Sequence, residues 1–240
     1  MFFLLDEKKN SYLIKGEQDF HCKYGVVSAK ELAGKKPGDI IKSHTGHTFN
    51  VLKPDSTDYL RKARKGPQSV TLKDLGLISA YTGVCSGYRV VDAGTGSGIM
   101  AMYLSNLVYP ERLVTYEIRD DFAKIAEGNI SKAQIDNIEL KKCDIYDGIE
   151  ERDLDLITLD LPEPWRVVEH ARCALKPGGF LVSYSPSIEQ SKKLCDVLDV
   201  FHQTTLECLS REWDMRTVRP KSRMLGHSGF LTFARLIVVD

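Results

Sequence analysis

The chain has 240 residues, of which 42% are hydrophobic and 28% charged, and its formal net charge is zero. This composition is typical of a globular protein and excludes a fibrous or disordered one. No run of 18 apolar residues is present, and the apolar start at residues 1–5 is too short for a signal sequence. We therefore expect a cytoplasmic protein without a membrane span.

Residues 1–60 are predicted to form a small β-rich domain. Short apolar stretches alternate there with turn residues, which is typical of strands in a small barrel or sandwich. These stretches are residues 2–5, 12–14, 25–28, 39–41 and 48–52. Residues 57–67 then read as a short basic helix or linker that ends at Gly66 and Pro67.

The second predicted domain spans residues 61–240, where strand and helix patterns alternate. Strands are expected at 88–92, 113–117, 138–142, 154–161, 180–184, 204–209 and 230–239. Helices are expected at 72–82, 99–108, 120–130, 166–174 and 188–200. Such alternation indicates βαβ units and a mainly parallel sheet, so the predicted fold class is α/β.

A glycine-rich loop follows the first of these strands. Gly94, Gly96 and Gly98 occupy alternate positions between the strand and a predicted helix that starts at Ile99. Glycine lets a backbone turn tightly and approach a ligand closely, and ligands of such sheets bind at the carboxyl ends of the strands. The G-x-G-x-G spacing differs from the dinucleotide fingerprint G-x-G-x-x-G and favours S-adenosylmethionine over NAD. A tight turn without a ligand is the alternative.

Two carboxylates are placed to complete a nucleoside site. Glu117 ends the second strand, 19 residues after Gly98, where a carboxylate accepts hydrogen bonds from ribose hydroxyls. Asp144 follows the third strand, where its side chain would meet the adenine amino group.

The sequence Asp-Leu-Pro-Glu-Pro-Trp at 160–165 follows the fourth strand and therefore faces the same crevice. Its prolines stiffen the loop, and we expect Trp165 to supply an aromatic wall. Asp160 would then be a carboxylate held near the reactive end of the cofactor. A helix-capping Asp beside a packed Trp is the alternative.

The zero net charge conceals a separation along the chain. Residues 1–75 carry a net charge of +5, residues 76–210 of −8, and residues 211–240 of +3. Two basic groups flank the acidic middle and are candidates for contact with RNA phosphates, although each charge is also compatible with ordinary solvated surface. They are Arg61, Lys62, Arg64 and Lys65, and Arg216, Arg219, Lys221 and Arg223.

The six cysteines contain no C-x-x-C pair, and we expect free, buried thiols. Cys22 with His44 and His47 lacks a fourth ligand at a suitable spacing, so no metal site is predicted.

Taken together, these motifs resemble the tRNA adenine-N1 methyltransferases, a family that modifies position 58 of the T-loop. Archaeal members also act on the neighbouring adenine 57. The resemblance covers roughly residues 35–240, and the loop at 160–165 with the basic C-terminal motif is its most specific part. It is carried by 92–98, Tyr116-Glu117, 160–165, 175–179, 184–186 with Gln190, 66–68, Lys73-Asp74, Arg219-Pro220, Arg223-Met224 and 227–235.

The resemblance implies a Rossmann-like class I methyltransferase sheet of seven strands whose last strand runs antiparallel, behind a small N-terminal β domain. It implies S-adenosylmethionine as cofactor, tRNA rather than DNA as partner, and a homotetramer. Carried over by position, the methyl-donor site would use Ser97, Gly98, Ile99, Met100, Glu117, Asp144 and Asp160. The sequence departs from the family at Thr71-Leu72, where an aromatic residue and proline are usual, and Thr71 cannot stack on a base.

Asp160 is the predicted catalytic residue, because a carboxylate accepting a hydrogen bond from the adenine amine would enrich N1. Two other readings stay open from the residues alone. One is a methyltransferase for small molecules or protein carboxylates, which would not need basic flanks. The other is a non-catalytic tRNA-binding subunit, which would not need an intact glycine loop or Asp160. An NAD enzyme is disfavoured by the glycine spacing.

Overall fold

The computed structural model describes residues 1–66, 69–224 and 226–237. The chain divides into two compact units, Met1–Ala63 and Arg64–Asp240. The boundary expected from composition, at residue 60, falls inside helix α2 (Ser56–Lys62), which belongs to the first unit.

The first unit is built on a four-stranded antiparallel sheet in the order β2-β1-β6-β5. Its buried core contains Leu4, Val27, Leu32, Phe49 and Val51. On β6, buried Phe49 and Val51 flank exposed Asn50, the alternation typical of a strand with one buried face. Asp55 caps α2 through a capping box with Asp58. The elements are β1 (Phe2–Asp6), β2 (Ser11–Ile14), β3 (Phe20–Cys22), β4 (Gly25–Val27), α1 (Ala29–Ala33), β5 (Ile40–Lys42), β6 (Thr48–Leu52) and α2.

The second unit contains a seven-stranded sheet in the order β12-β15-β11-β10-β7-β8-β9. Strand β15 pairs antiparallel with both neighbours, whereas the pairs from β11 to β9 are parallel. The strands are β7 (Val90–Ala93), β8 (Leu113–Tyr116), β9 (Ile138–Lys141), β10 (Leu154–Leu159), β11 (Leu175–Ser185), β12 (Phe201–Glu207) and β15 (Phe230–Leu236). Every residue of the central strands β7 and β10 is buried, as expected for a sheet covered on both faces.

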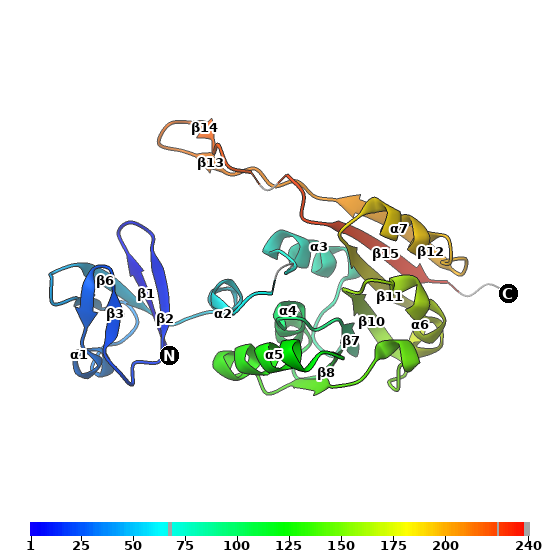
Figure 1. Cartoon of the computed structure of the whole chain (residues 1–240), viewed down its shortest axis with the longest axis horizontal. Coiled ribbons are helices and arrows are strands. Elements are labelled where there is room, and N and C mark those ends of the chain that lie inside the picture. Colours follow the sequence, from blue (N-terminus) through cyan, green and yellow to red (C-terminus); the bar gives the residue numbers. More distant parts are fainter. Residues whose placement is uncertain (67–68, 225, 238–240) are drawn as a thin grey trace. The chain divides into compact units, whose positions relative to one another are not determined.

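Helices cover both faces of this sheet: α3, α4 and α5 lie on one face and α6 and α7 on the other (Figure 1). They are α3 (Leu72–Thr82), α4 (Ile99–Val108), α5 (Asp120–Ala133), α6 (Val168–Ala174) and α7 (Ile188–Cys195), with short 3₁₀ turns η1 (Ile145–Asp147) and η2 (Pro164–Val167). Among the described residues, no helix combines the length and apolar character needed to cross a bilayer.

Several sequence expectations need correction. The elements β3, α1 and a small hairpin formed by β13 (Trp213–Asp214) and β14 (Arg219–Pro220) were not predicted. Helix α7 ends at Cys195 rather than at residue 200, and β15 ends at Leu236, while residues 238 and 239 lie outside the described part. None of the six cysteines is buried: Cys85, Cys143 and Cys173 are exposed, and the other three are partly exposed.

Candidate active site

Two loops meet at the carboxyl end of the central strands. The glycine loop follows β7, and the segment that begins with Asp160 follows β10, the strand paired with β7. The Asp160 N–H donates to the Ala93 carbonyl over 2.9 Å. A Cβ on Gly94, which has φ +80°, would lie 2.1 Å from the Asp160 carbonyl oxygen. Only glycine at position 94 therefore lets the two loops approach this closely.

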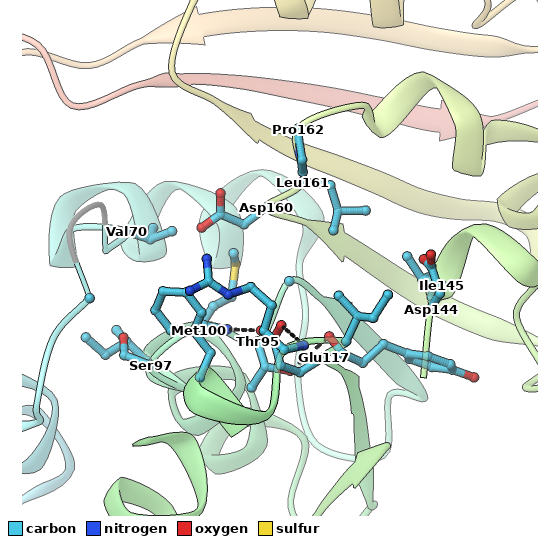
Figure 2. Close-up of a pocket in the computed structure, with 18 of the residues that line it drawn as sticks. Val70, Thr95, Ser97, Met100, Glu117, Asp144, Ile145, Asp160, Leu161 and Pro162 are labelled. Carbon is cyan, nitrogen blue, oxygen red and sulfur yellow. Dashed lines mark hydrogen bonds between the residues drawn. The ribbon is translucent and has the colours of Figure 1, made fainter. Parts of the chain in front are cut away.

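A cavity of about 470 Å³ opens beside these loops (Figure 2). Figure 2 shows Asp160 on the side of Val70, with Asp144 and Ile145 toward the other end. Most of the predicted cofactor residues line this cavity: Gly94, Gly96, Ser97, Ile99, Met100, Glu117, Asp144 and Asp160. Residues that follow four different strands, β7, β8, β9 and β10, thus line one cavity.

Glu117 is fixed by backbone groups on both sides. Its Oε2 accepts the Gly96 N–H over 2.8 Å, and its Oε1 accepts the Arg119 N–H over 2.9 Å. These bonds hold the carboxylate in place while each oxygen keeps an acceptor site free for hydroxyl groups. Asp144 is held similarly, because its Oδ1 accepts the Tyr146 N–H over 2.9 Å.

Asp92 lies fully buried beneath the glycine loop. Its two oxygens accept the hydroxyls of Thr158 on β10 and Thr115 on β8, both over 2.7 Å. Thr115 in turn contacts the Thr95 hydroxyl at 2.6 Å, so the network reaches the glycine loop. Burial raises the pKa of Asp92 to about 6, against the lowering effect of the two threonine hydroxyls.

Asp160 differs from the other carboxylates of the cavity. In the described part of the chain, no group donates a hydrogen bond to its carboxyl, although its backbone N–H is paired. Burial, followed by the nearby charges of Asp92 and Glu117, raises the pKa of Asp160 to about 7. A carboxyl with a perturbed pKa that faces a cavity is a typical functional group.

Some predicted site residues lie elsewhere. Gly98 does not line the cavity; a Cβ there would meet Ala126 of α5 at 3.2 Å, which points to close helix packing. Trp165 packs against the buried core under the Lys193 ammonium, 5.1 Å from its ring centre, and is absent from the cavity lining.

The residues of the two basic groups differ in the unit to which they belong and in their bonding partners. Arg61 and Lys62 belong to the first unit, where Lys62 donates to the Ser11 carbonyl over 2.5 Å. Arg64 and Lys65 belong to the second unit and are exposed. In the hairpin segment, Arg219 and Arg223 are exposed and form no ion pair with another described residue. Arg216 pairs with Asp214 and Lys221 with Glu212.

Sequence reasoning did not single out five other residues that line the cavity: Ser69, Val70, Phe122, Tyr146 and Leu161. The Ser69 hydroxyl lies 3.3 Å from that of Ser97, and the Arg166 guanidinium lies 4.1 Å from the centre of the Tyr146 ring. The motif at 66–68, directly before Ser69, was the available signal; Pro67 and Gln68 themselves lie outside the described residues.

Comparison with known proteins decides the family. The model of the family described as "tRNA methyltransferase complex GCD14 subunit" matches residues 63–221. The chain belongs to this family. It is 38% identical to the tRNA (adenine(57)-N(1)/adenine(58)-N(1))-methyltransferase TrmI of Methanocaldococcus jannaschii, over 97% of this chain and 94% of the relative. It is 32% identical to the tRNA (adenine(58)-N(1))-methyltransferase TrmI of Thermus thermophilus, over 97% and 95% of the two chains.

Solved structures agree on the fold. A SAM-dependent O-methyltransferase from Thermotoga maritima superposes with a TM-score of 0.92 and 30% identity, covering 100% of this chain and 93% of that one. The tRNA (m1A58) methyltransferase TrmI of Aquifex aeolicus gives a TM-score of 0.84 at 24% identity, covering 99% and 97%, and supports the fold alone. The predicted class I methyltransferase fold and the prediction of a methyltransferase are confirmed.

Proposed function

We propose that this protein transfers a methyl group from S-adenosylmethionine to N1 of adenine 58 in the T-loop of tRNA. The family match and the names of the relatives support this reaction. The observation that carries it is Asp160, whose carboxyl faces a cavity shaped for a nucleoside cofactor and has no hydrogen-bond donor among the residues that the structure describes. Adenine 57 is a proposed second target, because the relative from Methanocaldococcus jannaschii is named for both adenines.

The residues of the cavity fit S-adenosylmethionine. The preset Glu117 carboxylate suits the two ribose hydroxyls, and Asp144 suits the adenine amino group. The backbone of the glycine loop, with Ser97, Ile99 and Met100, would enclose the remainder. When bound, this cofactor supplies an electrophilic methyl group on a positively charged sulfur.

The chain's own contribution to the reaction is mainly positioning and electrostatic. Adenine N1 carries an in-plane lone pair, so no residue needs to remove a proton before attack. Ionised Asp160 would accept a hydrogen bond from the exocyclic amine, which orients N1 and stabilises the positive charge that develops on the purine. The rigid anchoring of Asp160 to Ala93 fixes this acceptor relative to the glycine loop.

We propose that both basic groups contact tRNA phosphates. A buried T-loop adenine must be turned out of its stack, and phosphate contacts offset that unfavourable step. Arg219 and Arg223, which are exposed and form no ion pair with another residue in the described part of the chain, are best suited to this role, followed by Arg61, Arg64 and Lys65. Lys62 is less available because its ammonium is bonded within its own unit, and Trp165 acts through loop packing rather than by stacking on a base.

We also propose that the protein works as a homotetramer in the cytoplasm, where tRNA is processed. The segment between β12 and β15 supports self-association, because large apolar side chains are exposed on it. Trp213 is 54% exposed and Met215 is 73% exposed, and Leu209, Val218 and Met224 are exposed as well. Replacing Trp213 and Met215 by Ser should lower the mass measured by light scattering; an unchanged tetramer would remove this segment from the interface.

The test of the proposed function is incubation of the purified protein with labelled S-adenosylmethionine and unmodified tRNA, followed by digestion to nucleosides. The expected product is 1-methyladenosine. Parallel reactions with small hydroxyl compounds and with carboxyl-rich proteins address the alternative suggested by the Thermotoga maritima neighbour. Label in those acceptors with none in tRNA would reject the proposal.

A further inference from the structure

The cavity carries an excess of negative charge. Glu117, Asp144 and Asp160 line it, and Asp92 lies directly beneath. Among the described lining residues, Arg119 is the only lysine or arginine, and its guanidinium is bonded to Asp121 at 2.7 and 3.2 Å. The space is therefore electrostatically prepared for a ligand that brings its own positive charge.

The carboxylates are not equally ready to be ionised. Glu117 and Asp144 accept backbone N–H groups, and Asp92 accepts two threonine hydroxyls. Asp160 receives no such bond within the described residues, while burial and the charges of Asp92 and Glu117 oppose its ionisation. Asp160 is thus the carboxyl whose charge depends most on what enters the cavity.

Of the groups around Asp160 whose pKa values are shifted, only Asp92 also changes its charge near neutrality. From β11, Tyr184 faces it with a pKa raised to about 12, first by burial and then by Asp74. Burial also raises the pKa values of Cys143 and Tyr146, which line the cavity. Asp92, with a pKa near 6, and Asp160, with a pKa near 7, are the groups whose charge changes there.

The methyl donor and its product differ by one methyl group and one positive charge on sulfur. A cation beside Asp160 favours the ionised carboxyl, whereas a neutral thioether does not. We infer that binding of the donor expels a proton from the Asp160 side of the cavity and that binding of the product does not, so preference for donor over product rises with pH. This inference rests on the proposed use of S-adenosylmethionine.

As a consequence, the charge of Asp160 changes during the reaction cycle. The expelled proton goes to solvent, and Asp160 becomes ionised when the donor is present, which is the state that accepts a hydrogen bond from adenine. After the methyl group has left and the nucleoside has gone, the neutral product no longer holds Asp160 ionised, and a proton returns. Product inhibition should therefore be strongest in acid.

Isothermal titration calorimetry of the full-length protein with S-adenosylmethionine and with S-adenosylhomocysteine tests this inference. Each titration is run between pH 5.5 and 7 in two buffers of different ionisation enthalpy, which counts the protons released. The ratio of the two affinities should rise about tenfold over this range, with proton release seen for the donor alone. A constant ratio, or equal proton release with both ligands, overturns the inference.

Three variants test whether Asp160 causes the pH dependence of the affinity ratio. Asp160→Asn should remove the pH dependence of the ratio, and Asp160→Glu should retain it. Asp144→Asn should weaken both ligands by the same factor at every pH, because both carry the same adenosine. An unchanged pH dependence in a folded Asp160→Asn protein contradicts the assignment. If neither ligand binds the wild-type protein, the proposed function fails as well; binding without the pH effect rejects this inference alone.

Discussion

Asp160 combines three properties that suit a functional carboxyl. It lines the cavity, its backbone is anchored to the end of β7, and its carboxyl has no hydrogen-bond donor within the described residues. The alternative of a simple helix cap is not supported, because the 3₁₀ turn η2 starts at Pro164, after a loop of its own. The carboxyl is therefore available for a ligand.

We predict that Asp160→Asn lowers the single-turnover rate of tRNA methylation by about 10²-fold, because the neutral amide stabilises the cationic purine poorly. Donor affinity at pH 7 should fall about tenfold, because the variant lacks the charge that the cationic donor favours, so the rate is compared at saturating donor. The matched control is Glu163→Gln in the same loop, whose side chain is half-exposed and paired with Arg166, and it should retain near wild-type turnover. Wild-type rates in a rapid-quench measurement of Asp160→Asn would refute the role.

A steric prediction concerns Gly94. In Gly94→Ala the new Cβ would meet the Asp160 carbonyl at 2.1 Å, so the two loops must separate. We expect loss of more than tenfold in donor affinity and a decrease of about 2 kcal/mol in the free energy of unfolding. Gly96→Ala is the control, because its Cβ would lie 3.7 Å from the nearest atom and only the positive φ is strained. Equal donor affinities of the two variants by calorimetry would contradict this steric account.

At the scale of elements, a polar cluster joins α3 to the segment that leads into β15. The Lys73 ammonium contacts the Asp74 carboxylate at 2.6 Å and the Ser228 hydroxyl at 2.7 Å. Asp74 is fully buried and also accepts the Thr71 hydroxyl over 2.7 Å. Thr71, which stands where the family usually has an aromatic residue, therefore supports this cluster. The cluster fixes the helix that follows the cavity wall at Ser69 and Val70.

We predict that Lys73→Met lowers the free energy of unfolding by about 3 kcal/mol, because it leaves the Asp74 charge buried without its cation. Lys73→Met combined with Asp74→Asn should recover part of this loss. Ser228→Ala removes one hydrogen bond and should lower it by about 1 kcal/mol. Denaturant titrations provide the comparison; a single Lys73→Met variant as stable as the wild type would show that the pair is dispensable.

The sequence predicted the α/β unit far better than the N-terminal one. Helices α3 and α4 begin and end where expected: Gly83 caps the end of α3, and Gly98 directly precedes α4. By contrast, β3 and α1 are too short to produce a periodic pattern, and the β13–β14 hairpin pairs only two residues per strand. The place of Gly94 and Glu117 in the cavity was predictable, because each directly follows a parallel strand and the carboxyl ends of these strands lie at the same edge of the sheet. Trp165 was expected to form a wall of the crevice, whereas its ring packs against the core; an aromatic side chain suits either place, so the sequence alone does not distinguish them.

For the whole molecule, the separation of charge along the chain matters more than its zero sum. Among the described residues between β12 and β15, Arg216 and Lys221 form ion pairs, whereas Arg219 and Arg223 form none. We predict that Arg219→Gln with Arg223→Gln weakens tRNA binding and reduces the slope of log affinity against log salt by about 2. Arg216→Gln with Lys221→Gln changes the net charge equally but removes ion-paired groups, and should reduce the slope less. Filter binding across a salt series measures both, and equal slopes would argue against specific phosphate contacts.

The central claim is that the Asp160 cavity methylates a T-loop adenine. The most direct test is methyl transfer to three otherwise identical tRNA transcripts: one unaltered, one with adenine 58 replaced by guanine, and one with adenine 57 replaced. The account predicts 1-methyladenosine in the unaltered transcript and its loss at position 58 when that adenine is replaced, with any remaining product confined to position 57. Unchanged incorporation at another position in all three transcripts would contradict it.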